Sequence, residues 1–158
     1  MKRPKIVIIL HNVRSAHNVG AIFRTADAIG VERIYLSGYT PLPLDRFSRP
    51  VKEIAKTALG AEQTIPWEKI SRIDPLLTRL SREGWSLVAV EQDVRAQDYK
   101  SYVPKGNTVL CLGNEVRGLS PKLKAKFDTL IQIQMHGEKE SLNVSVAFGV
   151  VLFQLFDR

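Results

Sequence analysis

Residues 141–156 read SLNVSVAFGVVLFQLF, a polar start followed by an almost continuous apolar run. On a helix with about 3.6 residues per turn, the apolar side chains of this run point in every direction rather than along one stripe. They are Val146, Ala147, Val150, Val151, Leu152, Phe153, Leu155 and Phe156. The run is shorter than the roughly 18 residues of a membrane span. We therefore predict a helix buried on nearly all sides, inside the protein or between two copies of it, and no membrane association.

The composition is that of a single globular domain covering residues 1–158. Hydrophobic residues make up 44% and charged residues 25%, which excludes the disordered and fibrous classes. The apolar run at residues 6–10 is too short for a signal-peptide core, so we interpret it as the first strand of a cytoplasmic protein. Cys111 is the only cysteine, and its apolar surroundings predict a buried thiol rather than a nucleophile. The histidines show no metal-site spacing.

The formal charge of +7 favours a polyanionic partner, because basic side chains release counterions when they bind phosphates. Residues 121–126 (PKLKAK) fit a phosphate-binding face and a merely solvated face equally well. Other cations lie in or near the early loops, namely Arg14, Arg46, Arg49, Lys52 and Lys56. This spread favours a broad phosphate-contacting face over a charged tail. Residues 39–50 (YTPLPLDRFSRP) form the most irregular stretch, either a substrate-facing lid or a simple connection.

Short apolar runs alternate with helical patterns along the chain, which predicts an α/β fold with a mainly parallel sheet and helices on both faces. The expected strands are residues 6–10, 33–36, 87–90, 109–112 and 130–133. Helices are expected from Asn18 to Gly30, over residues 50–59, over residues 74–83 and at the C-terminus. Asp74 is the expected N-cap of the third helix, with Pro75 in its first turn.

The loop after the first strand contains Asn18 as the expected N-cap, and Gly20 at the second helical position would leave first-turn amides open to an anion. The stretch lacks two glycines of the GxGxxG dinucleotide fingerprint. Arg24 lies one and a half turns further on, so both side chains reach one site only if Asn18 acts from the capping position. The alternative is that Asn18 merely caps the helix and Arg24 pairs with Asp27 or solvent.

Two later loops also combine glycine with polar side chains. Residues 110–122 (LCLGNEVRGLSPK) end a strand and suggest a backbone-lined pocket at the carboxyl edge of a parallel sheet. Glu115 is its candidate polar anchor, or else a surface carboxylate paired with a neighbouring Lys or Arg. Residues 133–147 lead into the final helix, where a capping role alone would explain Ser141 or Asn143.

Together, in this order and spacing, the three loops resemble the SpoU/TrmH branch of the SPOUT methyltransferases. The resemblance rests on residues 18–26 (NVGAIFRTA), on residues 112–120 (LGNEVRGLS), and on residues 133–135 (IQM) with 141–147 (SLNVSVA). It covers essentially the whole chain. One departure is Gln134, where the family usually has proline and therefore a stiffer loop.

The resemblance implies properties that residue patterns do not. Because unknotted right-handed connections are the rule, the patterns alone favour a Rossmann-like sheet. The family instead implies a C-terminal deep trefoil knot and a pocket for S-adenosyl-L-methionine (AdoMet), with no metal. The cofactor-binding residues implied are Val90, Glu91, Gly113, Ile133, Met135 and Leu142.

The family also implies transfer of a methyl group from AdoMet to a ribose 2′-hydroxyl of tRNA or rRNA by a homodimer that pairs through the C-terminal helix. Arg24 of one subunit is then expected to face the cofactor of the other. It would bind the target phosphate and stabilise alkoxide charge, because a guanidinium with a pKa above about 12 is a poor base. The residues expected to act in catalysis are Arg24, Asn18, Glu115, Ser141 and Asn143. The alternatives are a catalytically inactive RNA-binding protein of the same fold and, less favoured, a Rossmann-type nucleotide enzyme.

Overall fold

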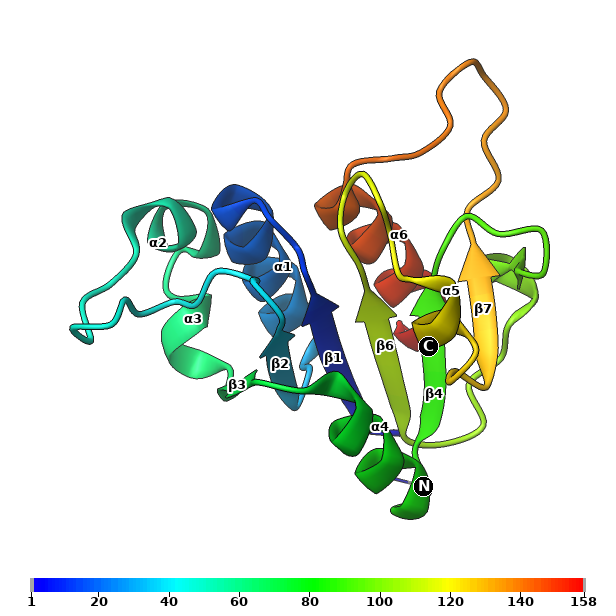
Figure 1. Cartoon of the computed structure of the whole chain (residues 1–158), viewed down its shortest axis with the longest axis horizontal. Coiled ribbons are helices and arrows are strands. Elements are labelled where there is room, and N and C mark those ends of the chain that lie inside the picture. Colours follow the sequence, from blue (N-terminus) through cyan, green and yellow to red (C-terminus); the bar gives the residue numbers. More distant parts are fainter. Residues whose placement is uncertain (1, 158) are drawn as a thin grey trace.

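The computed structural model describes residues 2–157, which fold into one parallel sheet with helices on both faces (Figure 1). The sheet has seven strands in the order β3-β2-β1-β6-β4-β7-β5, and every pairing is parallel. The strands are β1 (Ile6–His11), β2 (Arg33–Ser37), β3 (Trp67–Ile70), β4 (Ser86–Val90), β5 (Gln97–Asp98), β6 (Thr108–Leu112) and β7 (Thr129–Gln132). The helices are α1 (Ala16–Ile29), α2 (Lys52–Ala58), α3 (Ala61–Thr64), α4 (Ile73–Arg82), α5 (Pro121–Lys124) and α6 (Val144–Phe156), with a 3₁₀ turn η1 (Tyr99–Ser101).

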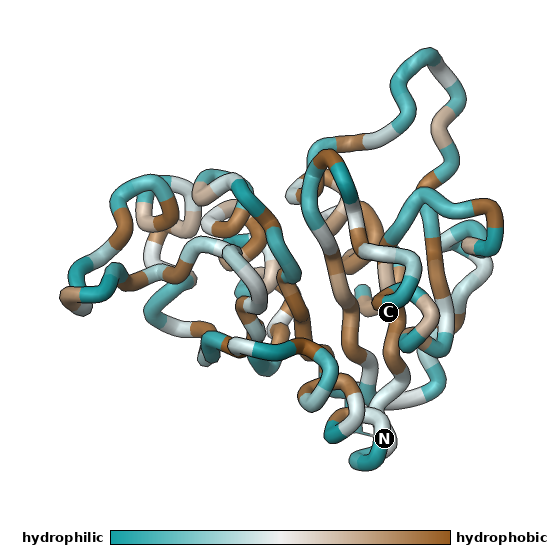
Figure 2. The backbone as a smooth tube through the Cα atoms, viewed as in Figure 1, coloured by the Kyte–Doolittle hydropathy of each residue, from teal (hydrophilic) through white to brown (hydrophobic). Residues whose placement is uncertain are grey.

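Alternating strand residues build a separate hydrophobic core on each face of the sheet. Ile8 and Leu10 of β1 face the core formed with α1, α2, α3 and α6, whereas Val7 and Ile9 face the core formed with α4 and α5. Figure 2 shows the central strands as the most hydrophobic part of the backbone, with polar loops around them. The predicted α/β class, the parallel sheet and the placement of helices on both faces are confirmed, while the C-terminal knot stays a prediction.

Every strand expected from the sequence is present, with boundaries within a residue of those predicted. The sequence patterns missed β3 and β5, which lie at the two edges of the sheet. Both are short, and none of their residues is fully buried. They therefore lack the apolar run by which a central strand of a parallel sheet is recognised.

Two predicted helix starts are wrong in detail. α1 begins with Ser15 as its N-cap, and the Ser15 hydroxyl accepts a hydrogen bond from the Asn18 N–H, so Asn18 lies inside the first turn. α4 begins after Arg72 without a side-chain cap, and Asp74 instead pairs with Lys126 at 2.9 Å. Pro75 does lie in the first turn of α4, as expected. The predicted C-terminal stop at Gly30 is confirmed, because this residue adopts the left-handed φ of 84° that closes α1.

Gly20 lies in the second turn of α1 rather than at the predicted second helical position, and it has a packing role. It is buried in α1 where that helix meets α2, and a Cβ there would overlap Thr57 Oγ1 and the Ile54 carbonyl oxygen. The Thr57 hydroxyl uses this close approach to donate a hydrogen bond to the His17 carbonyl at 2.9 Å. A residue without a side chain is thus required for α1 and α2 to pack at this distance.

Replacing Gly20 by alanine is therefore expected to lower the free energy of unfolding by about 1–3 kcal/mol, the usual cost of overpacking a well-packed contact. Urea unfolding at neutral pH measures the change. Gly106→Ala is the matched control, because a Cβ at Gly106 meets nothing within 4 Å. Equal stability of the two variants would contradict the packing role of Gly20.

Helix α6 is less enclosed than its composition predicts. Phe148, Val151, Leu152, Leu155 and Phe156 are buried in the core against α1 and the sheet. Its opposite side exposes Val146, Val150 and Phe153, which keep 52%, 39% and 42% of their surface in contact with solvent. The expectation of burial on nearly all sides is therefore not met within one chain. Among residues 2–157, no helix has the length and apolarity needed to cross a membrane.

Candidate active site

A cavity of about 340 Å³ opens at the carboxyl edge of β4, β6 and β7. Its walls come from the loops that follow these strands and from the first turn of α6. Every residue expected to bind the cofactor lines it, namely Val90, Glu91, Gly113, Ile133, Met135 and Leu142. Glu115 and Ser141, which were expected to act in catalysis, line the same cavity. Loops distant in sequence thus meet at the sheet edge where parallel α/β folds bind ligands.

Two glycines allow the loop after β6 to fold back against the cavity wall. A Cβ at Gly113 would lie 2.8 Å from Leu119 Cδ2. Gly118 has a left-handed φ of 63°, and a Cβ there would lie 2.5 Å from the carboxylate of Glu91. The Leu119 N–H then donates a hydrogen bond to this carboxylate. The glycines of this motif therefore allow the backbone to approach Glu91 closely.

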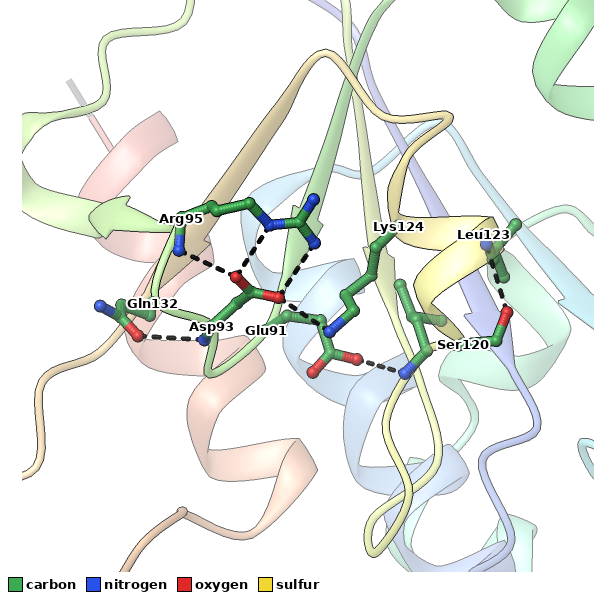
Figure 3. Close-up of polar contacts among 8 residues, drawn as sticks. Glu91, Asp93, Arg95, Ser120, Leu123, Lys124 and Gln132 are labelled. Carbon is green, nitrogen blue, oxygen red and sulfur yellow. Dashed lines mark hydrogen bonds and ion pairs between the residues drawn. The ribbon is translucent and has the colours of Figure 1, made fainter.

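The wall beside Glu91 carries a fixed pattern of charge. Burial raises the pKa of Glu91, although the Leu119 N–H and the charge of Lys124 act in the opposite direction. Asp93 lies between Arg95 and Lys124 (Figure 3), with its Oδ2 2.8 Å from Lys124 Nζ. Hydrogen bonds from the side chains of Arg95, which has the larger effect, and Lys124 hold the pKa of Asp93 far below its usual value. The pair with Lys124 ties the loop after β4 to α5 and so fixes one wall of the cavity.

A second polar cluster beside the cavity joins all three sequence motifs. The N–H groups of Arg14 and Ser15 donate to the carboxylate of Glu115 at 3.0 and 3.1 Å. Asn143 Nδ2 donates to Asn18 Oδ1 at 3.2 Å. The start of α1, the loop after β6 and the start of α6 are therefore held together by side chains that the sequence singled out.

Asn143 also caps α6, because its Oδ1 accepts a hydrogen bond from the Ser145 N–H at 2.9 Å. The capping role expected for Ser141 or Asn143 thus belongs to Asn143, while Ser141 lies exposed on the preceding loop. Within residues 2–157, Glu115 does not make the surface ion pair that was its alternative role, and its hydrogen-bond partners include the backbone amides above.

The pKa of Glu115 reflects these contacts. Burial alone would raise it, but the N–H groups of Arg14 and Ser15 and the side chain of Asn18 stabilise the charged form, so the pKa lies below its usual value. A carboxyl group with a lowered pKa stabilises the fold above its unfolded-state pKa of about 4.3. That contribution is lost as the pH falls through the lower pKa of the folded state.

Glu115→Gln is therefore expected to reduce the free energy of unfolding at pH 7 by about 1 kcal/mol, the difference between charged and neutral hydrogen bonds. The difference in the free energy of unfolding between wild type and variant should narrow at acid pH, because protonated Glu115 is neutral, as glutamine is. Urea unfolding at neutral pH and below the folded-state pKa measures both effects. Glu138→Gln is the control, because Glu138 is exposed. A difference in unfolding free energy between wild type and Glu115→Gln that widens on acidification would refute the stabilising role of charged Glu115.

Arg24 lies apart from this cavity. Its side chain is exposed on α1, in a surface hollow of about 520 Å³ that it shares with Lys56 and Thr57 of α2 and Phe153 of α6. Within the part of the chain that the structure describes, no ion pair joins Arg24 to Asp27. One chain thus brings together Asn18, Glu115, Ser141 and Asn143 near the cofactor residues, but leaves Arg24 at the exposed side of α6.

Sequence reasoning missed Asn114, which organises the loop after β6. Its Nδ2 donates to the Asn12 carbonyl at 3.1 Å and to the Tyr39 hydroxyl at 3.0 Å. Its Oδ1 accepts the N–H groups of Val116 and Arg117. An asparagine between glycine and a charged residue just after a strand is typical of turns in which its side chain bonds the backbone, so the sequence pattern could have predicted this role of Asn114.

Cys111 is fully buried in the core beside α4, and this burial raises the pKa of its thiol, as expected for a structural cysteine. In residues 2–157, no group of three or more His, Cys, Asp or Glu side chains is placed to hold a metal ion.

Comparison with known proteins identifies the family of this chain. The model of the SpoU rRNA Methylase family matches residues 5–153. The chain belongs to the SpoU rRNA Methylase family. It is 34% identical over 155 residues to the 23S rRNA (guanosine-2′-O-)-methyltransferase RlmB of Ralstonia nicotianae, covering 96% of this chain and 58% of that protein. The chain spans 57–58% of the length of the curated relatives it matches.

Solved structures of SpoU proteins share the fold. The AdoMet-bound rRNA methyltransferase of Sinorhizobium meliloti is 30% identical, with a TM-score of 0.83 over 97% of this chain and 56% of that one. The TrmH/SpoU tRNA modifying enzyme of A. aeolicus is 28% identical, with a TM-score of 0.83 over 97% of this chain and 74% of that one. The family expected from the three motifs is therefore confirmed.

Proposed function

We propose that this SpoU-family chain transfers the methyl group of AdoMet to a ribose 2′-hydroxyl of tRNA or rRNA. The observation that carries the proposal is the cavity, which gathers every expected cofactor-binding residue beside the hydrogen-bonded pair Asn18 and Asn143 and the carboxylate of Glu115. Relatives named as rRNA 2′-O-methyltransferases and a neighbour titled as a tRNA modifying enzyme support it.

The residues around the cavity fit AdoMet chemically. A volume of about 340 Å³ lies in the range of small-molecule sites. Val90, Ile133 and Leu142 give apolar walls for an adenine ring. Carboxylates suit the sulfonium and ammonium charges of the ligand, and Glu91 and Glu115 both line the cavity. When bound, AdoMet supplies the electrophilic methyl carbon.

The chain's own groups would then hold the acceptor in line with that carbon, since alignment alone is worth effective molarities of about 10⁵ M or more. Asn18, Glu115, Ser141 and Asn143 position the ribose and the motif loops. Arg24 binds the target phosphate and stabilises the charge that develops on the ribose oxygen. Because a guanidinium is a very weak base, Arg24 does not take the proton, which leaves through phosphate or water.

The same proposal requires a homodimer. Val146, Val150 and Phe153 of α6 form an exposed apolar face, and Arg24 lies at its border beside Phe153. A second copy seated on this face in two-fold symmetry would cover the apolar side chains. It would also carry its Arg24 towards the cavity of this chain, which this chain's own Arg24 does not line. Such an enzyme would act on RNA in the cytoplasm.

Incubation of the purified protein with labelled AdoMet and with tRNA or rRNA fractions tests the proposal directly. Label in ribose 2′-O-methyl nucleotides of one fraction is the expected result and identifies the substrate class. AdoMet binding by calorimetry without any transfer would favour the alternative of an inactive RNA-binding protein. No AdoMet binding at all would overturn the cofactor assignment.

A further inference from the structure

The loop between β2 and α2 carries an exposed aromatic ring between two arginines. Phe47 keeps 62% of its surface in solvent. The guanidinium carbon of Arg46 lies 4.7 Å from the centre of its ring, and that of Arg49 lies 4.9 Å away. In Figure 1 this loop, residues 44–50, extends away from the sheet beyond α2. Phe47 belongs to neither of the two hydrophobic cores.

This loop is held in one shape by its own hydrogen bonds. Asp45 Oδ1 accepts the N–H of Phe47 at 2.8 Å and that of Arg49 at 3.0 Å, and its Oδ2 pairs with Arg49 Nε at 3.1 Å. Leu44 and Pro50 close the loop in an antiparallel bridge. The Asp45 charge is neutralised by Arg49 within the loop, so the ring is presented by a preformed turn whose remaining cation, Arg46, faces solvent.

A path of cations connects this loop to Arg24. Lys52 and Lys56 are exposed one helical turn apart on α2, which begins directly after the loop. Lys56 and Arg24 line the same surface hollow. Glu53 is the one carboxylate of α2 in this stretch, so cations predominate from the loop tip to Arg24. A polyanion that contacts Arg24 can therefore extend along α2 to Phe47.

We infer that residues 44–50 bind an unpaired nucleotide of the RNA substrate, with its base stacked on the Phe47 and arginine group and its flanking phosphates on Arg46, Lys52 and Lys56. Aromatic rings and guanidinium planes are the groups on which proteins stack unpaired bases. A duplex offers no free base face for such stacking, so the partner is single-stranded RNA. This inference rests on the RNA methyltransferase function proposed above and adds a binding site for the RNA substrate at residues 44–50.

The experiment measures binding of a fluorescent oligoribonucleotide of alternating cytidine and adenosine, which cannot pair with itself, by fluorescence anisotropy at several salt concentrations. Phe47→Leu should weaken binding about tenfold without changing the salt dependence, because it removes stacking but no charge. Phe47→Trp should restore the affinity. Arg46→Gln should instead reduce the slope of log affinity against log salt by about 0.7, the value of one phosphate contact.

Arg82→Gln on α4 is the control for charge, since Arg82 is exposed on the opposite face of the sheet. Failure of wild type to bind the oligonucleotide, or equal affinity of wild type and Phe47→Leu, would overturn the inference. These outcomes are separate from the proposed function, because AdoMet binding and methyl transfer by the wild-type protein are measured without reference to Phe47. A duplex of the same length that binds as tightly as the single strand would also count against stacking.

Discussion

Arg24→Ala is expected to lower the rate of methyl transfer by about 10²–10³, the usual effect of removing one group that stabilises developing negative charge. AdoMet affinity should not change, because Arg24 is assigned to the target phosphate and the ribose oxygen, and it does not line the AdoMet cavity of its own chain. The variant should fold normally, since its side chain makes no core contact. Single-turnover transfer and calorimetry separate the two effects. Arg82→Ala on α4 serves as the control for removal of an exposed arginine.

A mixing experiment tests whether Arg24 acts across a dimer. Leu142 lines the cavity and is 42% exposed, so Leu142→Arg should block AdoMet with little cost to folding. Each variant alone is expected to have little or no activity. If Arg24 acts on the other subunit, mixed dimers contain one complete site and regain activity. Absence of any recovery after subunit exchange would assign Arg24 to its own chain's cavity instead.

Phe153→Glu is expected to convert the protein to monomers and to abolish methyl transfer at the same time. Phe153 is 42% exposed on the outer side of α6 and lines the hollow that contains Arg24. A carboxylate there would replace apolar contact with a second copy by a charge that must lose its water on burial, a cost that Arg24 and Lys56 of the same hollow offset only in part, so the dimer dissociation constant should rise by about 10²-fold. Analytical ultracentrifugation gives the oligomeric state, and the transfer assay gives the activity. Val150→Glu should behave in the same way.

Val103→Glu places the same charge on a valine that is 56% exposed outside α1 and α6, and it should remain dimeric and active. Circular dichroism establishes that the Phe153→Glu monomer is folded, which is expected because the core side of α6 is untouched. A fully active Phe153→Glu monomer would refute both the dimer face and the shared site.

Much of the fold follows from local patterns. Central strands such as β1 and β6 are buried on both faces and appear in the sequence as continuous apolar runs. Gly30 marks the end of α1 because only a residue without a side chain adopts its φ readily. The edge strands β3 and β5 were not predictable in this way, because their pairing depends on a neighbour supplied by a distant part of the chain.

The candidate site, like the fold, was predictable from the sequence only in part. Residue types and spacing were sufficient to name Gly113, Glu115 and Asn143, since their motifs are contiguous in sequence. Their partners were not predictable: Glu115 binds the amides of Arg14 and Ser15, about a hundred positions away along the chain. Asn18 was assigned as a cap because asparagine favours that position, but Ser15 precedes it and takes the role.

The apolar periodicity of the sequence by itself indicated the two-faced sheet, and its three ordered motifs indicated the family and, through that resemblance, the residues expected at the cavity. Only the tertiary structure decided which faces remain uncovered. It turns Phe148 and Val151 of α6 inward and leaves Phe153 and Val150 outside, although each pair consists of identical side chains. It also separates Arg24 from the cavity. A helix that is hydrophobic all round does not specify which of its sides meets the core, because that choice depends on where the other elements lie.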